Sequence, residues 1–129
     1  MAYVLLLEPD RVLSRTYAQA LEHVGHWAYG AQTGQEAIEA LETFKADVIV
    51  LELQLAGHGG IEFLHELRSY PEWQNLPVII NTNLPPQALA PLWAALQRDA
   101  GVTICLYKPR TNLQQFLRAV NEGTGGGVS

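Results

Sequence analysis

Several residue types and patterns are scarce in this sequence, and each scarcity excludes a class of protein. The single cysteine, Cys105, excludes internal disulfides and cysteine-rich metal clusters. Only eight lysines and arginines, scattered along the chain, stand against thirteen acidic residues, which argues against a nucleic-acid-binding surface. No apolar run approaches the roughly 20 residues of a membrane-spanning helix, and the first ten residues lack the basic segment of a signal peptide. We therefore expect a cytoplasmic protein without direct contact to nucleic acid or membrane.

A further absence concerns nucleotide cofactors. After the first apolar run the sequence continues EPDRVLS and has no glycine-rich phosphate-binding turn, so a nucleotide site is not expected there. What the chain does have is a hydrophobic share of 48% against 16% charged residues, which is enough for a packed core. Its 129 residues fit one domain, which we place at residues 1–122, followed by a flexible glycine-rich tail at 123–129.

Five short segments have the character of β-strands. Four of them are nearly continuous apolar runs, which are typical of parallel sheets with both faces covered. The remaining segment, second in chain order, is less apolar. The predicted strands are Tyr3–Leu7, His26–Ala31, Ala46–Leu51, Val78–Asn81 and Val102–Tyr107.

Helical periodicity fills the segments between these strands. Apolar residues three and four positions apart predict helices at 12–24, 59–69 and 113–120. Thr33 and Glu36 form a capping-box pattern that opens a helix through Phe44. The helix before the last strand contains Pro91, and a proline inside a helix removes a hydrogen bond and clashes with the preceding turn. This helix is expected either to kink at Pro91 or to begin there, after an irregular stretch at 84–90.

Strands and helices thus alternate along the whole chain. Such alternation predicts an α/β fold, a three-layer αβα sandwich around a five-stranded parallel sheet. In such sheets, functional groups gather where the strands end at their carboxyl side. The polar residues at these ends, which we expect to converge at one end of the sheet, are Glu8, Asp10, Glu52, Thr82 and Lys108.

Four segments together resemble the receiver domain of bacterial two-component response regulators. They are VLLLEPD, ADVIVLELQLAGHGG, LPVIINTN and CLYKPR, and the resemblance extends over residues 2–120. It implies a CheY-like, flavodoxin-type fold with strand order 2-1-3-4-5, and a role in signalling rather than in enzymatic catalysis. It also implies that position 52 is the phospho-acceptor and that acids after the first strand hold Mg²⁺.

Near the acceptor, several positions depart from the pattern of this family. The acceptor position holds Glu52 in place of aspartate, and Pro9 stands where a second metal-binding acid is usual. In the loop that follows, Ala56 and Gly59 replace the usual proline and the usual acid. The departures therefore concern the acceptor and the metal ligands.

On the last two strands the match is closer. Thr82 stands at the position of the switch hydroxyl, and Lys108 with Pro109 forms the lysine-proline signature, 56 residues beyond Glu52. The resemblance implies that the Lys108–Pro109 peptide bond is cis. The switch-aromatic position falls on Cys105, but Tyr107 lies two residues later on the same face of the strand.

The function depends above all on Glu52. Its extra methylene carries the carboxylate about 1.5 Å further than that of an aspartate, and such a displacement costs on the order of a hundredfold in the rate of an in-line phosphoryl transfer. We therefore interpret Glu52 as a non-phosphorylatable residue that holds Lys108, and also Thr82, in lasting contact. Three alternatives stay open. In the first, Glu52 only neutralises Lys108. In the second, Glu52 is an unusual but working phospho-acceptor. In the third, the chain is a small ligand-binding α/β domain.

A magnesium cofactor is not expected, although oxygen ligands are present. Glu8 and Glu52 are the two candidates for a residual cation site. Asp10 directly precedes a helix, and we expect its side chain to cap that helix, with cation binding as the alternative. His58, in the loop after Glu52, is expected to be an exposed loop histidine.

The helix that contains Trp93 is unusually apolar and suggests a binding face. Its contact residues are expected to be Leu92, Trp93, Leu96 and Tyr107, on the surface that the fourth helix, fifth strand and fifth helix share in receivers. The expected partner is a histidine kinase or another signalling protein, and a second copy of the chain is possible at the same face. Trp93 itself is expected either on this surface or inside the core. A DNA-binding output domain does not fit within 129 residues, unless the sequence belongs to a longer protein.

Overall fold

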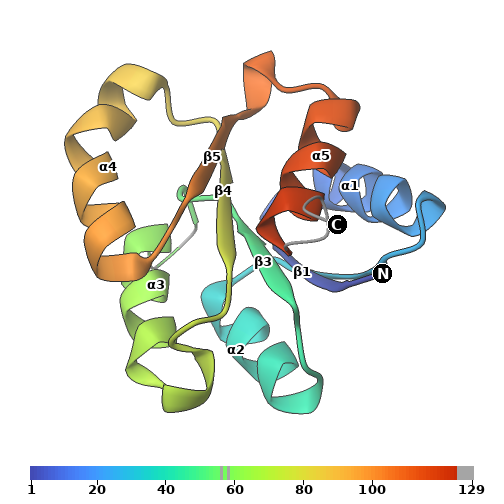
Figure 1. The fold of residues 1–129 in the computed structure, drawn as a ribbon, viewed down its shortest axis with the longest axis horizontal. Helices are drawn as coiled ribbons and strands as arrows, with labels where there is room; N and C mark the ends of the chain where they lie inside the picture. Colours follow the sequence, from blue (N-terminus) through green and yellow to red (C-terminus); the bar gives the residue numbers. More distant parts are fainter. Residues whose placement is uncertain (56, 58, 125–129) are drawn as a thin grey trace.

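The computed structural model describes residues 1–55, 57 and 59–124, in which strands and helices alternate as predicted (Figure 1). The strands are β1 (Tyr3–Leu7), β2 (Trp27–Ala31), β3 (Val48–Leu51), β4 (Val78–Thr82) and β5 (Ile104–Tyr107). The helices are α1 (Arg11–His23), α2 (Gly34–Thr43), α3 (Gly60–Ser69), α4 (Pro86–Ala100) and α5 (Leu113–Gly123). Two short 3-10 turns, η1 (Pro71–Trp73) and η2 (Lys108–Arg110), complete the chain order.

All five strands run parallel in one sheet of order β2-β1-β3-β4-β5, which confirms the predicted fold class. From β1 the chain moves outward to β2 and then crosses back to β3 on the other side of β1. The strand order therefore switches between β1 and β3, and the carboxyl ends of these two strands border the crevice that such a switch creates. Glu8 and Glu52 directly follow these two strands.

Helices cover both faces of the sheet (Figure 1). Helices α1 and α5 lie on one face, and α2, α3 and α4 lie on the other. Alternate residues of each strand enter opposite halves of the core, because side chains alternate along a strand. Leu5 and Ile49 pack with Phe63 on the α3 side, whereas Leu6 and Val50 pack on the side of α1 and α5.

Side chains at the predicted positions cap two of the helices. Asp10 accepts hydrogen bonds from two backbone N–H groups in the first turn of α1, which confirms it as the N-cap. Thr33 caps α2 by accepting from the backbone N–H of Glu36. The Glu36 carboxylate accepts from the N–H of Gln32 rather than from that of Thr33, so the second half of the capping box is shifted by one residue.

Helix α4 begins five residues before Pro91, the start that one of the two expectations gave it. Pro86 occupies its first position, where a missing N–H is tolerated, and the helix continues through Pro91. Leu89 and Leu96, which are seven residues apart and therefore share one face of the helix, are both buried. They anchor the helix to the core on both sides of Pro91, which is exposed. The expectation of an irregular stretch at 84–90 with a helix start at Pro91 is wrong.

The expectation of a cis bond at Lys108–Pro109 is also wrong. No peptide bond among the described residues is cis. Pro109 lies in the middle of the 3-10 turn η2, which Thr111 closes by donating its N–H to the Lys108 carbonyl. This turn is built from trans peptides, and trans is the preferred state of X-Pro bonds in general.

Some expectations concern residues outside the described part of the chain. Ala56 and His58 are outside it, and so is 125–129, most of the predicted tail. Helix α5 includes Gly123, so the first residue of the predicted tail is helical. Among the described residues, no helix has the length and apolar character needed to cross a membrane.

Candidate functional site

The polar residues at the strand ends meet at one end of the sheet. Glu8 follows β1, Glu52 follows β3, Thr82 ends β4, and Lys108 follows β5. Because the strands are parallel and adjacent, their last residues lie side by side, and long side chains there can meet. Glu8, Glu52 and Thr82 are buried, and the Lys108 side chain is only 6% exposed. The structure thus brings together four residues that the sequence places up to 100 positions apart.

Glu52 accepts four hydrogen bonds, two at each carboxylate oxygen. Its Oε1 accepts from Lys108 Nζ (2.8 Å) and from the backbone N–H of Asn83 (3.1 Å). Its Oε2 accepts from the Thr82 hydroxyl and from the backbone N–H of Gln54 (3.0 Å). A carboxylate offers about four lone-pair positions. Groups of the protein itself therefore occupy all the accepting positions of Glu52.

Lys108 bridges two carboxylates. Its Nζ lies 2.8 Å from Glu52 Oε1 and 2.5 Å from Glu8 Oε1. The other oxygen of Glu8 accepts from the backbone N–H of Asp10 (3.0 Å). One ammonium thus serves two buried carboxylates, so its loss would leave both anions without a cation in a place of low polarity.

Two opposing effects set the protonation states of this cluster. Burial acts to raise the pKa of Glu52, but the hydrogen bonds from Lys108, Thr82 and Gln54 outweigh burial, and the pKa of Glu52 is lowered. Burial acts to lower the pKa of Lys108, but the hydrogen bonds and charges of Glu52 and Glu8 raise it overall. Glu52 is therefore anionic and Lys108 cationic at neutral pH.

Sequence reasoning missed two of the four donors to Glu52, the backbone groups of Gln54 and Asn83. Every residue except proline has a backbone N–H, so no pattern in the sequence could have singled them out. Thr82 extends the network, because its hydroxyl oxygen accepts from the backbone N–H of Leu84 (3.0 Å). The segment between β4 and α4 is thereby connected to Glu52 both by the Thr82 side chain and by the backbone N–H of Asn83.

A comparison with protein families agrees with these motifs. A family model described as the response regulator receiver domain matches residues 4–121. The chain belongs to this family. Membership makes it a signalling domain of two-component systems, not an enzyme.

The names of curated relatives of this receiver include a transcriptional regulatory protein and a response regulator. The KDP operon transcriptional regulatory protein KdpE of Escherichia coli is 36% identical over 80 residues, which are 62% of this chain and 34% of KdpE. Response regulator MprA of Mycolicibacterium vanbaalenii is 26% identical over 132 residues, which are 98% of this chain and 54% of MprA. The receiver thus spans between about a third and about half of these relatives.

Solved structures share the fold over nearly the whole receiver. The chemotaxis response regulator CheY4 of Vibrio cholerae has a TM-score of 0.82 at 22% identity, covering 95% of this chain and 98% of CheY4. The receiver domain of the Francisella response regulator 1452 has a TM-score of 0.81 at 26% identity, covering 97% and 98%. At 22% identity, the likeness to CheY4 shows the fold alone.

The donor set of the cleft does not fit the Mg²⁺ ion that receivers are expected to hold. The Lys108 ammonium lies between the two carboxylates that would be the ligands, Glu8 and Glu52. Pro9 offers no side-chain ligand, and Asp10 is exposed and caps α1. Among the described residues, no group of three or more His, Cys, Asp or Glu side chains could hold a metal ion. Magnesium binding itself stays a matter of prediction.

A groove of about 610 Å³ lies between α4 and β5 of the receiver, and Leu89, Trp93, Cys105 and Tyr107 are among its lining residues. Trp93 is half-buried, so it both packs against the core and lines the groove, and neither expectation for it holds alone. Leu96 is only 4% exposed and packs in the core, so its assignment to the contact surface is wrong.

Burial, together with the charge of Glu52, raises the pKa of the Cys105 thiol to about 11, which keeps it protonated.

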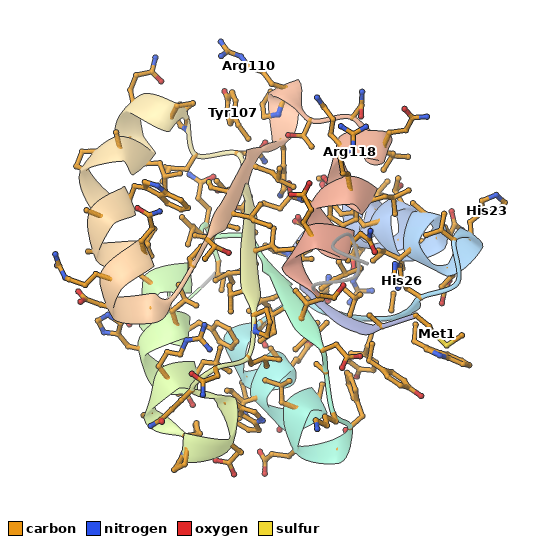
Figure 2. All side chains as sticks on the ribbon, in the orientation of Figure 1. Met1, His23, His26, Tyr107, Arg110 and Arg118 are labelled. Atoms are coloured by element: carbon orange, nitrogen blue, oxygen red, sulfur yellow. The ribbon has the colours of Figure 1, made fainter. Side chains whose placement is uncertain are left out.

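The last residue of β5 and the turn after it form a further contact that the sequence did not indicate. The guanidinium of Arg110 lies 5.8 Å from the centroid of the Tyr107 ring, within the range of a cation–π contact. Figure 2 shows both side chains together at one end of the molecule, beyond β5. Tyr107 is also the partner of Thr82 in the pairing of β4 with β5. It thus connects the carboxylate network of the cleft with the groove beside α4.

Proposed function

We propose that this receiver is a pseudo-receiver, a protein-interaction module that is not phosphorylated at position 52 and holds one conformation. The four hydrogen bonds to Glu52 carry this proposal. A nucleophilic carboxylate needs an accessible lone pair in line with the phosphoryl group. In this chain the accepting positions of both oxygens are already occupied by donors of the protein.

The same four bonds support a fixed conformation. In the family, as the resemblance implies, the lysine and the switch hydroxyl engage the phosphoryl group after phosphorylation. Here the longer side chain of Glu52 engages both Lys108 and Thr82 directly. A single negative charge thus stays permanently in contact with the two residues that would otherwise engage the phosphoryl group.

The partner of this module would be a histidine kinase or another signalling protein, bound at α4, β5 and α5. Leu92 is exposed on α4, and Trp93 and Tyr107 line the groove beside it. Aromatic side chains of this kind are favoured anchors of protein interfaces. Because Tyr107 pairs with Thr82, the contact between Thr82 and Glu52 would set the shape of this surface.

Intact mass spectrometry tests the proposal. The protein is incubated with acetyl phosphate and Mg²⁺, and the fraction that gains one phosphoryl group is followed over time. We expect no gain for the unaltered chain and none for Glu52→Gln. A gain that disappears in Glu52→Gln would show that Glu52 is a working acceptor and would overturn the proposal.

A restored receiver is the matched positive control. Pro9→Asp combined with Glu52→Asp supplies the second acid and shortens the acceptor side chain. We expect this variant to gain a phosphoryl group under the same conditions, in the presence of Mg²⁺ only. If it stays unmodified although circular dichroism shows that it is folded, the two departures at positions 9 and 52 do not explain the loss of phosphotransfer.

Hydrogen exchange distinguishes a fixed signalling conformation from a merely structural ion pair. Glu52→Ala removes the acceptor of Thr82 and Lys108, and we expect faster amide exchange in the segment 83–89 at the start of α4, with β2 unchanged. If exchange instead increases uniformly over all elements, Glu52 serves stability alone, and the conformational part of the proposal is wrong.

A further inference from the structure

An exposed aromatic cluster lies at the β2 edge of the sheet, and the groove beside β5 lies at the other edge. Tyr3, Trp27 and Tyr29 are 46%, 54% and 52% exposed. Tyr3 stacks on Trp27 with ring centroids 5.8 Å apart, and Phe44 lies 6.2 Å from Tyr3 and 5.7 Å from Tyr29. We call these four residues the aromatic cluster. The receiver function described above uses none of them.

Met1 extends the aromatic cluster, because Trp27 Nε1 donates a hydrogen bond to Met1 Sδ. Figure 2 shows Met1 and His26 on the side of the molecule away from Tyr107 and Arg110. Burying the exposed half of these rings would be favourable, and a contiguous patch of exposed aromatic side chains is typical of a protein contact site.

Strand β2, which contributes Trp27 and Tyr29, is an edge strand whose only partner among the described residues is β1. The N–H of Trp27 donates to Ala2, and the carbonyl of Ala31 accepts from Glu8, so these β2 groups point toward β1. In a strand, every second residue directs its backbone groups to the same side. The N–H and C=O groups of Ala28 and Gly30 therefore point outward from the sheet.

The sequence of β2 does not protect this edge. Natural edge strands usually carry lysine, proline or inward-pointing charges that prevent pairing with another chain. Trp27–Ala31 reads WAYGA and contains no charged residue and no proline. A net charge of −5 makes copies of this chain repel each other, but β2 itself carries no charge that adds to this repulsion.

We propose that two copies of this chain pair antiparallel through β2, with Tyr29 on the two-fold axis. In this register Ala28 of one copy pairs with Gly30 of the second copy, and the reverse pair is related by symmetry. The outward backbone groups then form four hydrogen bonds, two in each pair. Only this register pairs all five residues of β2, and it places the Tyr29 residues of both copies opposite each other on the aromatic face.

The apolar area sets the expected strength of this dimer. A half-exposed aromatic ring offers about 100 Å² for burial, so the three half-exposed rings of each copy, Tyr3, Trp27 and Tyr29, together supply about 600 Å² in the dimer. Stable interfaces bury roughly 1,200–2,000 Å² in total, so the backbone pairing of β2 and Met1 must supply the rest. The dimer is therefore expected to dissociate in the micromolar range. It leaves the groove between α4 and β5, at the other edge of the sheet, accessible to a different partner.

Sedimentation velocity over a concentration series gives the first measurement. We expect the unaltered chain to move from monomer to dimer with rising concentration. Tyr29→Lys brings two like charges together on the axis and is expected to raise the dissociation constant at least tenfold. Leu92→Lys, which places the same charge on the exposed surface of α4, is the control and is expected to leave the dissociation constant unchanged. A monomer at all concentrations, or a dimer broken by Leu92→Lys and not by Tyr29→Lys, would overturn the proposal.

Cysteine cross-linking tests the register in a Cys105→Ser background. Opposed residues without mutual hydrogen bonds have Cα atoms about 4.5 Å apart, which lies within the range of disulfides. Tyr29→Cys is therefore expected to give a covalent dimer on mild oxidation. Trp27→Cys is the matched control, since its two copies would be about 14 Å apart along the strands. Equal cross-linking of both variants, or of neither, would rule out this register. Neither experiment depends on whether Glu52 is phosphorylated.

Discussion

The two edges of the sheet are built from different interactions. Beside β5, two cationic side chains, the buried Lys108 and the half-buried Arg68, hold neighbouring elements together. Lys108 bridges Glu8 and Glu52 at the carboxyl end of the sheet, and Arg68 lies at the other end. Beside β2, the rings of Tyr3, Trp27 and Tyr29 are exposed and in contact with one another or with Phe44.

This difference leads us to expect that the side chains at one edge respond little to changes at the other. Arg68 donates to the carbonyls of Ala100 (2.9 Å), Trp73 (2.7 Å) and Leu76 (2.8 Å), and so ties α3 and η1 to the end of α4. A partner at the β5 edge would therefore meet a surface whose shape depends on buried charges. A partner at the β2 edge would meet apolar rings whose contacts do not involve the cleft. Changes in the cleft should then alter the first edge and spare the second.

The largest expected effect comes from Lys108→Met, which keeps the length of the side chain and removes its charge. Two buried carboxylates then lack a cation, and we expect a loss of about 3–5 kcal/mol in the free energy of unfolding. Urea denaturation measures it. Lys45→Met, at an exposed lysine, is the control and should stay within about 0.5 kcal/mol of the unaltered chain. A loss below about 1 kcal/mol for Lys108→Met would mean that the buried pairing does not hold the cleft together.

Arg68→Ala should have the next largest effect, at the other end of the same edge. Hydrogen bonds from a charged donor are worth about 1.5–3 kcal/mol each, but water can replace part of them at this half-buried site, so we expect a loss of about 2 kcal/mol. Arg68→Lys should recover little, because an ammonium cannot reproduce the fork that reaches three carbonyls. The exposed Arg98, which pairs with Asp99, provides the comparison, and Arg98→Ala is expected to leave stability nearly unchanged.

The pH dependence of the unfolding free energy distinguishes variants at the cleft from variants at the β2 edge. The pKa of Glu52 is lowered in the folded state, so its contribution is present above the unfolded pKa of about 4.3 and is lost as pH falls through the folded pKa. Glu52→Gln should therefore lose part of the decrease in unfolding free energy that occurs as the pH falls from about 5 through the folded pKa. Tyr29→Lys, at the β2 edge, should keep that decrease. An unchanged decrease in Glu52→Gln would contradict the role assigned to its hydrogen bonds.

The sequence predicted the layers and the convergence of the cleft because both follow from strong, regular signals. Apolar runs such as that ending at Leu51 mark strands covered on both faces, and parallel strands bring their carboxyl ends together. The start of α4 was less predictable. The propensity of Pro91 argued for a break, but the burial of Leu89 and Leu96 on one face, a tertiary effect, outweighs it.

The finer structure of the cleft was beyond the sequence for a different reason. That Lys108 contacts Glu8 as well as Glu52 depends on side-chain positions across three strands. The backbone donors of Asn83 and Gln54 carry no residue-specific signal at all. The aromatic cluster was missed because Tyr3 meets Trp27 only through the pairing of β1 with β2, and Phe44 reaches it from the end of α2.

The smallest expected effect concerns Gly30 and tests how tightly the β2 edge is packed on its other face. A Cβ at Gly30 would lie 2.6 Å from the hydroxyl oxygen of Ser14 on α1, so Gly30→Ala alone should cost up to about 1 kcal/mol unless Ser14 rotates away. Gly30 has no positive φ, so alanine fits its backbone. The double variant with Ser14→Ala should then exceed the unaltered chain by about 0.5 kcal/mol, because alanine restricts the unfolded chain. Thermal unfolding measures both. Since the new methyl group faces α1 rather than the aromatic cluster, self-association should not change, and a weakened dimer in the double variant would show that the two faces of β2 are coupled.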